Sequence, residues 1–252
     1  MSMLDIRARW TRVGAMFATR ASTQRLDIED LLVQTAVSAP SDYRLFMVAA
    51  SWLAVHHNLI NARRFGRKLE ELDDVPSAVA GAMLAIALEA TPTSTQFRSA
   101  MRHCRPLNTP RPLFDTMAQH VVLLNKAKED ALPLFLRWGL WQDEVSLKMN
   151  AIRPVSWIVA NCPELRIRAL FGANLEAEIL DTVLQHGATA AELARVLGAT
   201  YAAVHDAASR LVGRGFVKRT RAGRRQVLSV PDEIAEWLAR FPTTPLRRRR
   251  RR

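Results

Sequence analysis

The first two thirds of the chain, residues 1–165, have the hydrophobic pattern of a helical domain. Apolar residues recur three and four positions apart, and alternating runs of β-branched residues are scarce. Prolines interrupt this pattern and predict helix boundaries, because proline lacks the amide hydrogen that a helix interior needs. The expected helices are Leu4–Ala18, Asp27–Val37, Asp42–Asn58, Ala62–Leu72, Ser77–Leu88, Thr93–His103, Leu113–Ala127, Leu132–Leu140 and Val155–Ala160.

Three shorter amphipathic segments follow in the last third of the chain. The first, residues 173–187, carries apolar residues on one helical face and ends on a glycine. The second begins at Thr189, and Glu192 three residues later completes the spacing of a capping box, in which each side chain satisfies the other residue's amide. This short helix ends at Gly198.

The third segment predicts the longest helix of this group. Thr200 is its N-cap, and the helix stops at Gly213 or Gly215. Its apolar residues point inward at helical spacing: Val204, Ala208 and Leu211.

A β-hairpin is expected after the third helix. Residues 216–220 and 225–230 have the pattern of two short strands, and the turn between them contains Gly223. The turn and the strands beside it are rich in arginine, so the tip of the hairpin is strongly basic.

The last third of the chain is thus expected to contain a helix, a second helix, a three-residue turn, a third helix and a hairpin. This order resembles the winged helix-turn-helix regulators of the ArsR-like and MarR-like type. The matching residues are Glu192, Leu193, Ala194, Leu197, Gly198, Thr200, Val204, Leu211, Gly215, Phe216 and Val217. The resemblance covers roughly residues 171–231 and implies a DNA-binding module whose third helix enters the major groove and whose hairpin is the wing. It implies nothing about the rest of the chain.

The expected fold class is therefore mainly α: an all-helical N-terminal domain followed by a winged helix-turn-helix domain with a short β-hairpin. We place the helical domain at residues 1–165, with a role in sensing, dimerisation or partner binding, and the winged helix at 166–240. Residues 241–252 contain two prolines and six terminal arginines, and we expect a disordered tail there. The tail is either a source of extra phosphate affinity or an incidental extension.

The charge supports a polyanionic partner. The formal net charge is +12, and nearly all of the excess lies from Arg214 onward, where it would attract the phosphates of double-stranded DNA. An alternative is that the module serves protein interaction or dimerisation and that its basic hairpin is only solvated.

The residues expected to contact DNA lie on the outer face of the third helix and on the hairpin. His205 can donate to guanine or, when protonated, approach a phosphate, whereas Asp206 would repel phosphates. The expected contacts are Thr200, Tyr201, Ala202, His205, Ser209, Arg210, Arg214, Lys218, Arg219, Arg221, Arg224 and Arg225.

Signatures of catalysis, cofactors and metals are missing from the sequence. There is no glycine-rich phosphate loop, no HExxH and no GxSxG, and Cys104 and Cys162 do not have the spacing of a zinc site. We therefore expect no enzyme, no cofactor and no metal. One weak alternative is the helical ribonuclease class, because Arg98 and His103 reproduce its Arg-x4-His spacing, a spacing that chance supplies easily in a chain so rich in arginine.

The resulting hypothesis is a bacterial-type transcriptional regulator that binds DNA as a homodimer and acts in the cytoplasm, at the nucleoid. No apolar run approaches the ~20 residues that cross a bilayer, so no membrane partner is expected. The arginines near the N-terminus, Arg7, Arg9, Arg12 and Arg20, fit either a basic helix face or, as an alternative, a transit peptide. A further alternative is an antitoxin or adaptor whose helical domain binds a protein partner.

Overall fold

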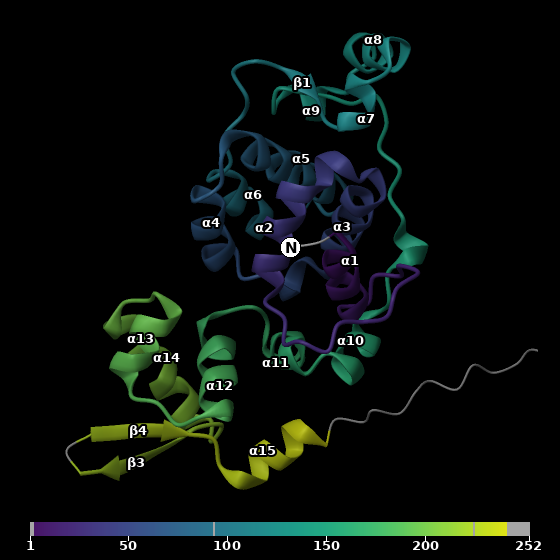
Figure 1. The fold of residues 1–252 in the computed structure, drawn as a ribbon. Helices are drawn as coiled ribbons and strands as arrows, with labels where there is room; N and C mark the ends of the chain where they lie inside the picture. The colour runs from purple at the N-terminus through teal and green to yellow at the C-terminus, as the bar shows by residue number, and fades with distance from the viewer. Residues whose placement is uncertain (1–2, 93, 224, 241–252) are drawn as a thin grey trace, which may run out of the picture. The chain divides into compact units, whose positions relative to one another are not determined.

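The computed structural model describes residues 3–92, 94–223 and 225–240, and the chain is mainly α-helical (Figure 1). It divides into two compact units, one up to Val155 and one from Ser156 onward. Among the described residues, no helix combines the length and the apolar composition needed to cross a bilayer.

The first unit is built around the apolar helix α5. This helix packs against α2, α3 and α6, and its central residues are small, so the neighbouring helices approach closely. Helices of this unit are α1 (Met3–Arg12), α2 (Ile28–Ser38), α3 (Tyr43–His56), α4 (Ala62–Glu70), α5 (Asp74–Ala90), α6 (Thr95–Met101), α7 (Asp115–Ala118), α8 (Val121–Glu129) and α9 (Pro133–Leu136). Strands β1 (Arg111–Pro112) and β2 (Leu140–Trp141) form a short parallel pair.

Three tryptophans lie in the core of the first unit: Trp10, Trp52 and Trp138. All three are buried, and the rings of Trp10 and Trp52 meet edge to face with centroids 5.7 Å apart. Their indole groups are hydrogen-bonded: Trp10 donates to Thr35 Oγ1 and Trp52 donates to the carbonyl of Val13, both at 2.8 Å. A buried tryptophan usually finds such an acceptor for its N–H, whereas the Nε1 of Trp138 has none among the described residues.

Several predicted helices are longer than those in the structure, and glycine or extended backbone explains the difference. The helix predicted over Leu4–Ala18 ends at Arg12, just before Gly14 with a φ of 90°. The helix predicted over Leu113–Ala127 is broken into α7 and α8, because His120 between them is extended. The helix predicted over Leu132–Leu140 ends at Leu136, and Gly139 adopts a φ of 68° where the backbone turns into β2.

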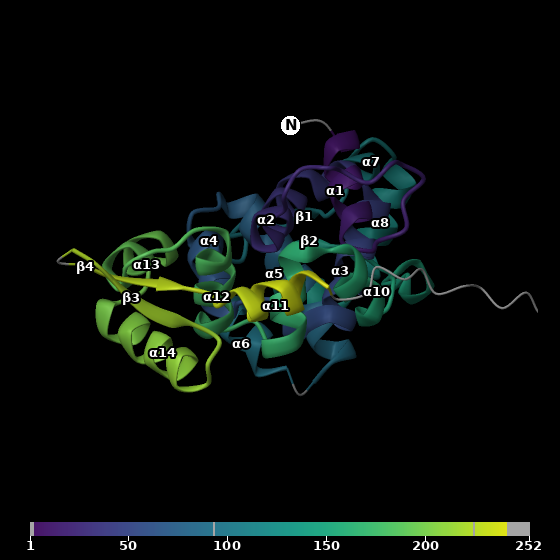
Figure 2. The ribbon, with the colours of Figure 1, turned by 90° about the horizontal axis from the view of Figure 1, so that it is seen from below.

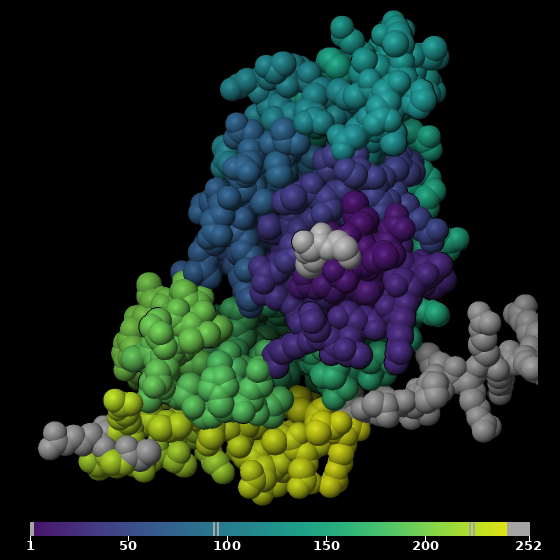
Figure 3. All heavy atoms as spheres, viewed as in Figure 1, coloured from purple at the N-terminus to yellow at the C-terminus, as the bar shows by residue number. Residues whose placement is uncertain are grey.

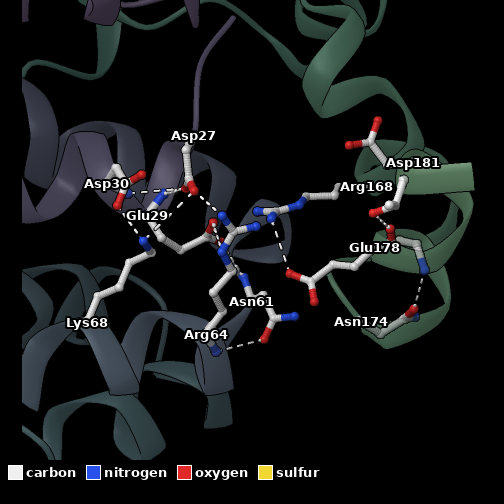
Figure 4. Close-up of polar contacts among 12 residues, drawn as sticks. Asp27, Glu29, Asp30, Asn61, Arg64, Lys68, Arg168, Asn174, Glu178 and Asp181 are labelled. Carbon is white, nitrogen blue, oxygen red and sulfur yellow. Dashed lines mark hydrogen bonds and ion pairs between the residues drawn. The ribbon is translucent and has the colours of Figure 1, made fainter. Parts of the chain in front are cut away.

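Ion pairs on the surface of the first unit link α2 to α4 (Figure 4). Arg64 pairs with Asp27, and Lys68 pairs with Asp30. The fully buried carboxylate of Glu29 accepts a hydrogen bond of 2.9 Å from the amide of Asn61, which precedes α4. These contacts fix the register between the two helices.

The second unit contains α10 (Val155–Asn161), which begins at the boundary, and all later elements. They are α11 (Pro163–Phe171), α12 (Leu175–Gln185), α13 (Ala190–Leu197), α14 (Tyr201–Gly213), the antiparallel strands β3 (Lys218–Ala222) and β4 (Arg225–Ser229), and α15 (Asp232–Ala239). In Figures 1 and 2 the turn end of the hairpin points away from the helices of this unit. In Figure 3 the hairpin and α15 form the yellow edge below the green helices.

Residues 156–165, which we assigned to the helical domain from the sequence, belong to this second unit. The side chain of Arg166 explains the connection, because it donates to the carbonyls of Val159 at 2.9 Å and of Leu238 at 2.8 Å. One guanidinium thus joins α10, α11 and α15. Helix α15, at residues 232–239, was not predicted from the sequence.

The core of the second unit is a single apolar cluster. Ile179 and Leu180 of α12, Leu193 of α13 and Leu211 of α14 are completely or almost completely buried in it. Leu228 of β4 adds the hairpin to the same cluster. A buried ion pair between Arg168 and Glu178, with 3.5 Å between nitrogen and oxygen, lies beside the start of α12 (Figure 4).

Candidate nucleic-acid interface

Helices α13 and α14 are joined by a tight turn whose local chemistry follows the sequence prediction. The capping box at the start of α13 is present: Thr189 Oγ1 accepts from the amide of Glu192 at 3.2 Å, and the Glu192 carboxylate accepts from the amide of Thr189 at 2.8 Å. Gly198 ends the helix in the left-handed conformation, with φ 56° and ψ 39°. Thr200 then caps α14 by accepting from the amide of Ala203. These caps set the angle between the two helices.

Helix α14 has three distinct faces. Val204, Ala207, Ala208 and Leu211 are buried in the core of the unit. Tyr201 and His205 are exposed and point toward the hairpin side, with their rings stacked at 6.1 Å between centroids. The third face, opposite the core, carries no cation; Ala202, Asp206 and Gly213 are exposed on it and Ser209 is half-buried.

The hairpin brings several cations to the same side of the unit. Lys218, Arg219, Arg221 and Arg225 are exposed, and the segment 218–229 contains no acidic residue. Arg219 is hydrogen-bonded to α14: its guanidinium donates to Ser209 Oγ at 2.6 Å. The remaining predicted hairpin contact, Arg224, lies outside the described residues.

Two of the predicted contacts, Arg210 and Arg214, are engaged on the opposite side of α14. Both pair with the carboxylate of Glu176 at the start of α12, Arg210 at 2.5 Å and Arg214 at 2.7 Å. Glu176 was not among the residues predicted for this site. No sequence signal marks this residue, since it lies 34 and 38 positions from its partners.

A hollow of about 590 Å³ lies between α13, α14 and the hairpin. Its inner surface includes the buried Ala208 and Leu228. The start of α13 forms one wall, Tyr201 and His205 form a second, and the hairpin residues Arg219, Arg225 and Gln226 form a third. Four residues that were predicted separately from the sequence line the hollow together: Tyr201, His205, Arg219 and Arg225.

The described residues that line this hollow carry more positive than negative charges. The carboxylate of Glu192 is engaged by Thr189, whose backbone and side-chain hydrogen bonds lower the pKa of Glu192, and the nearby charges of Arg225 and Arg195 lower it further. Arg225 is the first residue of β4, where it pairs with Ala222 of β3. The hollow is therefore lined by two guanidinium groups, those of Arg219 and Arg225, and by one ionised carboxylate, that of Glu192.

The two candidate nuclease residues lie in or close to α6: Arg98 is in the helix, and His103 is two residues beyond its end. Arg98 donates to the carbonyl of Pro92 at 2.9 Å, whereas His103 pairs with Glu70 at 2.7 Å, so the two candidate nuclease residues are held by different partners. Within the described part of the chain, no three His, Cys, Asp or Glu side chains converge as metal ligands. Cys104 and Cys162 are buried thiols, and burial raises the pKa of Cys104 to about 12.

The backbone of the hairpin also pairs with a residue outside its two strands, which the sequence did not indicate. Ala188, between α12 and α13, exchanges hydrogen bonds of 3.1 and 2.9 Å with Leu228 of β4. This bridge fixes the hairpin against the helices that surround the hollow.

Comparisons of the chain with protein-family models, with curated proteins and with solved structures find no match.

Proposed function

We propose that the second unit is a winged helix-turn-helix and that the protein is a transcriptional regulator binding duplex DNA. The observation that carries the proposal is the position of α14: its outer face is exposed beside a cationic hairpin that is anchored to the same core. The order α12, bridge at Ala188, α13, α14 and hairpin is the order of a winged helix.

In this proposal α14 enters the major groove and the hairpin follows the sugar–phosphate backbone or the neighbouring minor groove. An α-helix fits the width of the major groove, and the hairpin cations Lys218, Arg221 and Arg225 neutralise phosphates. Tyr201, His205 and Ser209 are the polar side chains of α14 nearest to base edges. Arg210 and Arg214 are paired with the carboxylate of Glu176, so they contact the flanking phosphates only when these ion pairs break.

Asp206 limits the way in which bases are read. Its carboxylate is exposed on the face of α14 opposite the core, and His205 Nδ1 lies 3.7 Å away. A carboxylate accepts a hydrogen bond from cytosine N4 but repels phosphate. We therefore assign most of the affinity to the hairpin and sequence discrimination to His205 and Asp206.

The proposal includes a homodimer, because one recognition helix contacts few base pairs and two half-sites multiply the discrimination. Three consecutive apolar residues of α8, Val121, Val122 and Leu123, are exposed, which is typical of a surface that another chain covers. Val122→Asp is expected to shift sedimentation from dimer to monomer, and an unchanged sedimentation coefficient would remove α8 from the interface.

A salt series on duplex DNA tests the proposed DNA binding. Lys218→Ala combined with Arg221→Ala should weaken binding to all duplexes alike and lower the salt slope by about 2, since each phosphate contact contributes about 0.9. The control removes two exposed cations elsewhere, Arg102→Ala with Arg240→Ala, and should leave the slope unchanged. Equal slopes for the two double variants would contradict the assignment of the hairpin.

His205→Ala tests the recognition helix separately. This substitution should change the preference among duplex sequences by about 1–3 kcal/mol at one base pair, while the salt slope changes little. An unchanged order of preference would show that α14 does not read bases through this side chain.

A further inference from the structure

A second cationic surface lies on the first unit, distant in sequence from the hairpin. Residues 6–26 contain five arginines and no acidic residue, and residues 145–155 contain two cations and likewise no acidic residue. The two segments meet where Ala15 and Ile152 form an antiparallel bridge, and in Figure 1 the loop after α1 runs beside the segment that leads to α10. Their cations are therefore gathered on one part of the unit.

The connection between α1 and α2, residues 13–27, is long and yet follows a fixed course. Connections longer than about 12–15 residues without secondary structure of their own are usually either functional or disordered. This connection is held by hydrogen bonds to its neighbours: the amide of Met16 donates to the carbonyl of Ala151 at 2.8 Å, and the amide of Ser22 donates to the carbonyl of Ala8 at 2.9 Å. An ordered loop of this length has the properties of a contact surface.

Two arginines of this surface are held in position by their neighbours. The guanidinium of Arg12 donates to the carbonyl of Ser22 at 3.1 Å, and that of Arg44 donates to the carbonyl of Met16 at 3.2 Å. The Arg44 guanidinium also lies 5.6 Å from the ring centroid of Phe17, which is a cation–π distance. Because a guanidinium has five N–H donors, each of these groups keeps donors for a phosphate after such a bond.

The charge of this surface is neutralised only in part. The guanidinium of Arg7 pairs with the buried carboxylate of Asp42 at 2.5 Å, so this arginine adds little to the positive field. Other arginines on the two segments are exposed to solvent. We call the following residues the arginine face: Arg12, Arg20, Arg25, Arg44 and Arg153.

We propose that the arginine face binds the sugar–phosphate backbone of duplex DNA without reading its sequence. Guanidinium groups form paired hydrogen bonds with phosphate oxygens, and residues 6–26 and 145–155 contain no acidic residue that would repel them. The choice of DNA among polyanions rests on the proposed function, whereas the cationic surface itself does not. The hairpin and α14 then discriminate between sequences, and the arginine face adds affinity that falls with salt.

A salt series with the full chain and a fluorescent duplex of scrambled sequence tests the arginine face. Arg20→Gln combined with Arg153→Gln should lower the salt slope by about 1.8, at about 0.9 per phosphate contact. The loss of affinity should thus be about twelvefold greater at 50 mM than at 200 mM salt. Arg20→Lys combined with Arg153→Lys keeps both charges and should retain most of the slope.

Arg63→Gln combined with Arg102→Gln is the matched control. It removes two exposed cations of the same unit, one on α4 and one at the end of α6, and should leave the slope unchanged. The proposal is overturned if the two glutamine pairs give the same slope and the same affinity at every salt concentration, with circular dichroism verifying that each variant is folded. It is also overturned if Arg20→Gln with Arg153→Gln loses binding to phosphatidylserine vesicles while its DNA slope equals that of the control, because the surface would then bind lipid.

A combined variant separates this inference from the proposed function. Adding the hairpin pair Lys218→Ala and Arg221→Ala to Arg20→Gln and Arg153→Gln should lower the slope by about 3.6, because independent phosphate contacts add. If the hairpin pair alone has no effect and the arginine-face pair has the expected effect, the winged helix is contradicted and this inference is supported. The reverse result would overturn this inference and leave the proposed function.

Discussion

Replacing Glu176 by glutamine separates structural arginines from arginines that reach DNA. The Glu176 carboxylate holds both Arg210 and Arg214, and it is 17% exposed while the two arginines are 54% and 57% exposed. Glutamine keeps the size of the side chain and removes the charge that restrains them. If both guanidinium groups then contact phosphates, the salt slope of DNA binding should steepen by up to about 1.8, at about 0.9 per contact.

This slope corresponds to a measurable change in affinity. Between 50 and 200 mM salt, a slope difference of about 1.8 changes the ratio of variant to parent affinity by about twelvefold, with the variant favoured at low salt. The free energy of unfolding should fall by only about 1 kcal/mol, because exposed ion pairs contribute about 0–1 kcal/mol each. The same substitution thus strengthens DNA binding and slightly weakens the fold.

Fluorescence anisotropy across the salt series measures the slope, and urea denaturation measures the stability. Glu233→Gln is the control, since it removes an exposed acid of α15 in the same unit. If Glu176→Gln and Glu233→Gln give the same slope and also the same affinity at every salt concentration, Arg210 and Arg214 are structural residues and our assignment of them to DNA contacts is wrong.

Three further predictions concern stability. Thr189→Ala should lower the free energy of unfolding of the second unit by about 0.5–2 kcal/mol because α13 loses its cap, and Thr189→Ser should restore it in urea denaturation; equal stability of all three would contradict the capping role. Gly81→Ala should cost about 1–3 kcal/mol, because a Cβ there would lie 2.5 Å from the ring of Trp138; an unchanged melting temperature would show that the ring moves freely. Burial lowers the pKa of His56 from 6.5 to about 4, so the folded state favours the neutral ring. The corresponding contribution to the free energy of unfolding, roughly 3 kcal/mol, is present above pH 6.5 and is lost as the pH falls toward 4. His56→Gln should flatten this pH dependence in urea titrations, and identical pH profiles would contradict it.

Local signals in the sequence predicted local structure well. The capping box of Thr189 and Glu192 is present, and α14 begins and ends where Thr200 and the following glycines indicate. These features depend on residues three or four positions apart, whose contacts the helix itself creates.

Features that depend on distant residues were not predicted. The boundary near Val155 depends on Arg166 reaching Val159 and Leu238, and the last of these is 72 positions away. Helix α15 is anchored mainly by one buried residue, Leu238, and eight residues give too little periodicity to identify it.

The candidate interface was predicted as a set of residues but not as an arrangement. Sequence spacing placed Tyr201 and His205 on one side of a helix, and it placed the cations on a hairpin. Only the packing of Leu228 against the helices brings Arg219 and Arg225 beside those rings, and only the fold reveals that Glu176 restrains Arg210 and Arg214.

Selection from a library of random duplexes measures whether the second unit reads DNA sequence. The full chain and a shortened chain that ends at Arg240 are each used for several rounds, followed by a salt series on the enriched and scrambled duplexes. If α14 and the hairpin read DNA, both chains should enrich the same motif and prefer it at least a hundredfold over scrambled DNA. Absence of an enriched motif, or salt-labile binding that is equal for all duplexes and vanishes without residues 241–252, would contradict a DNA-reading winged helix.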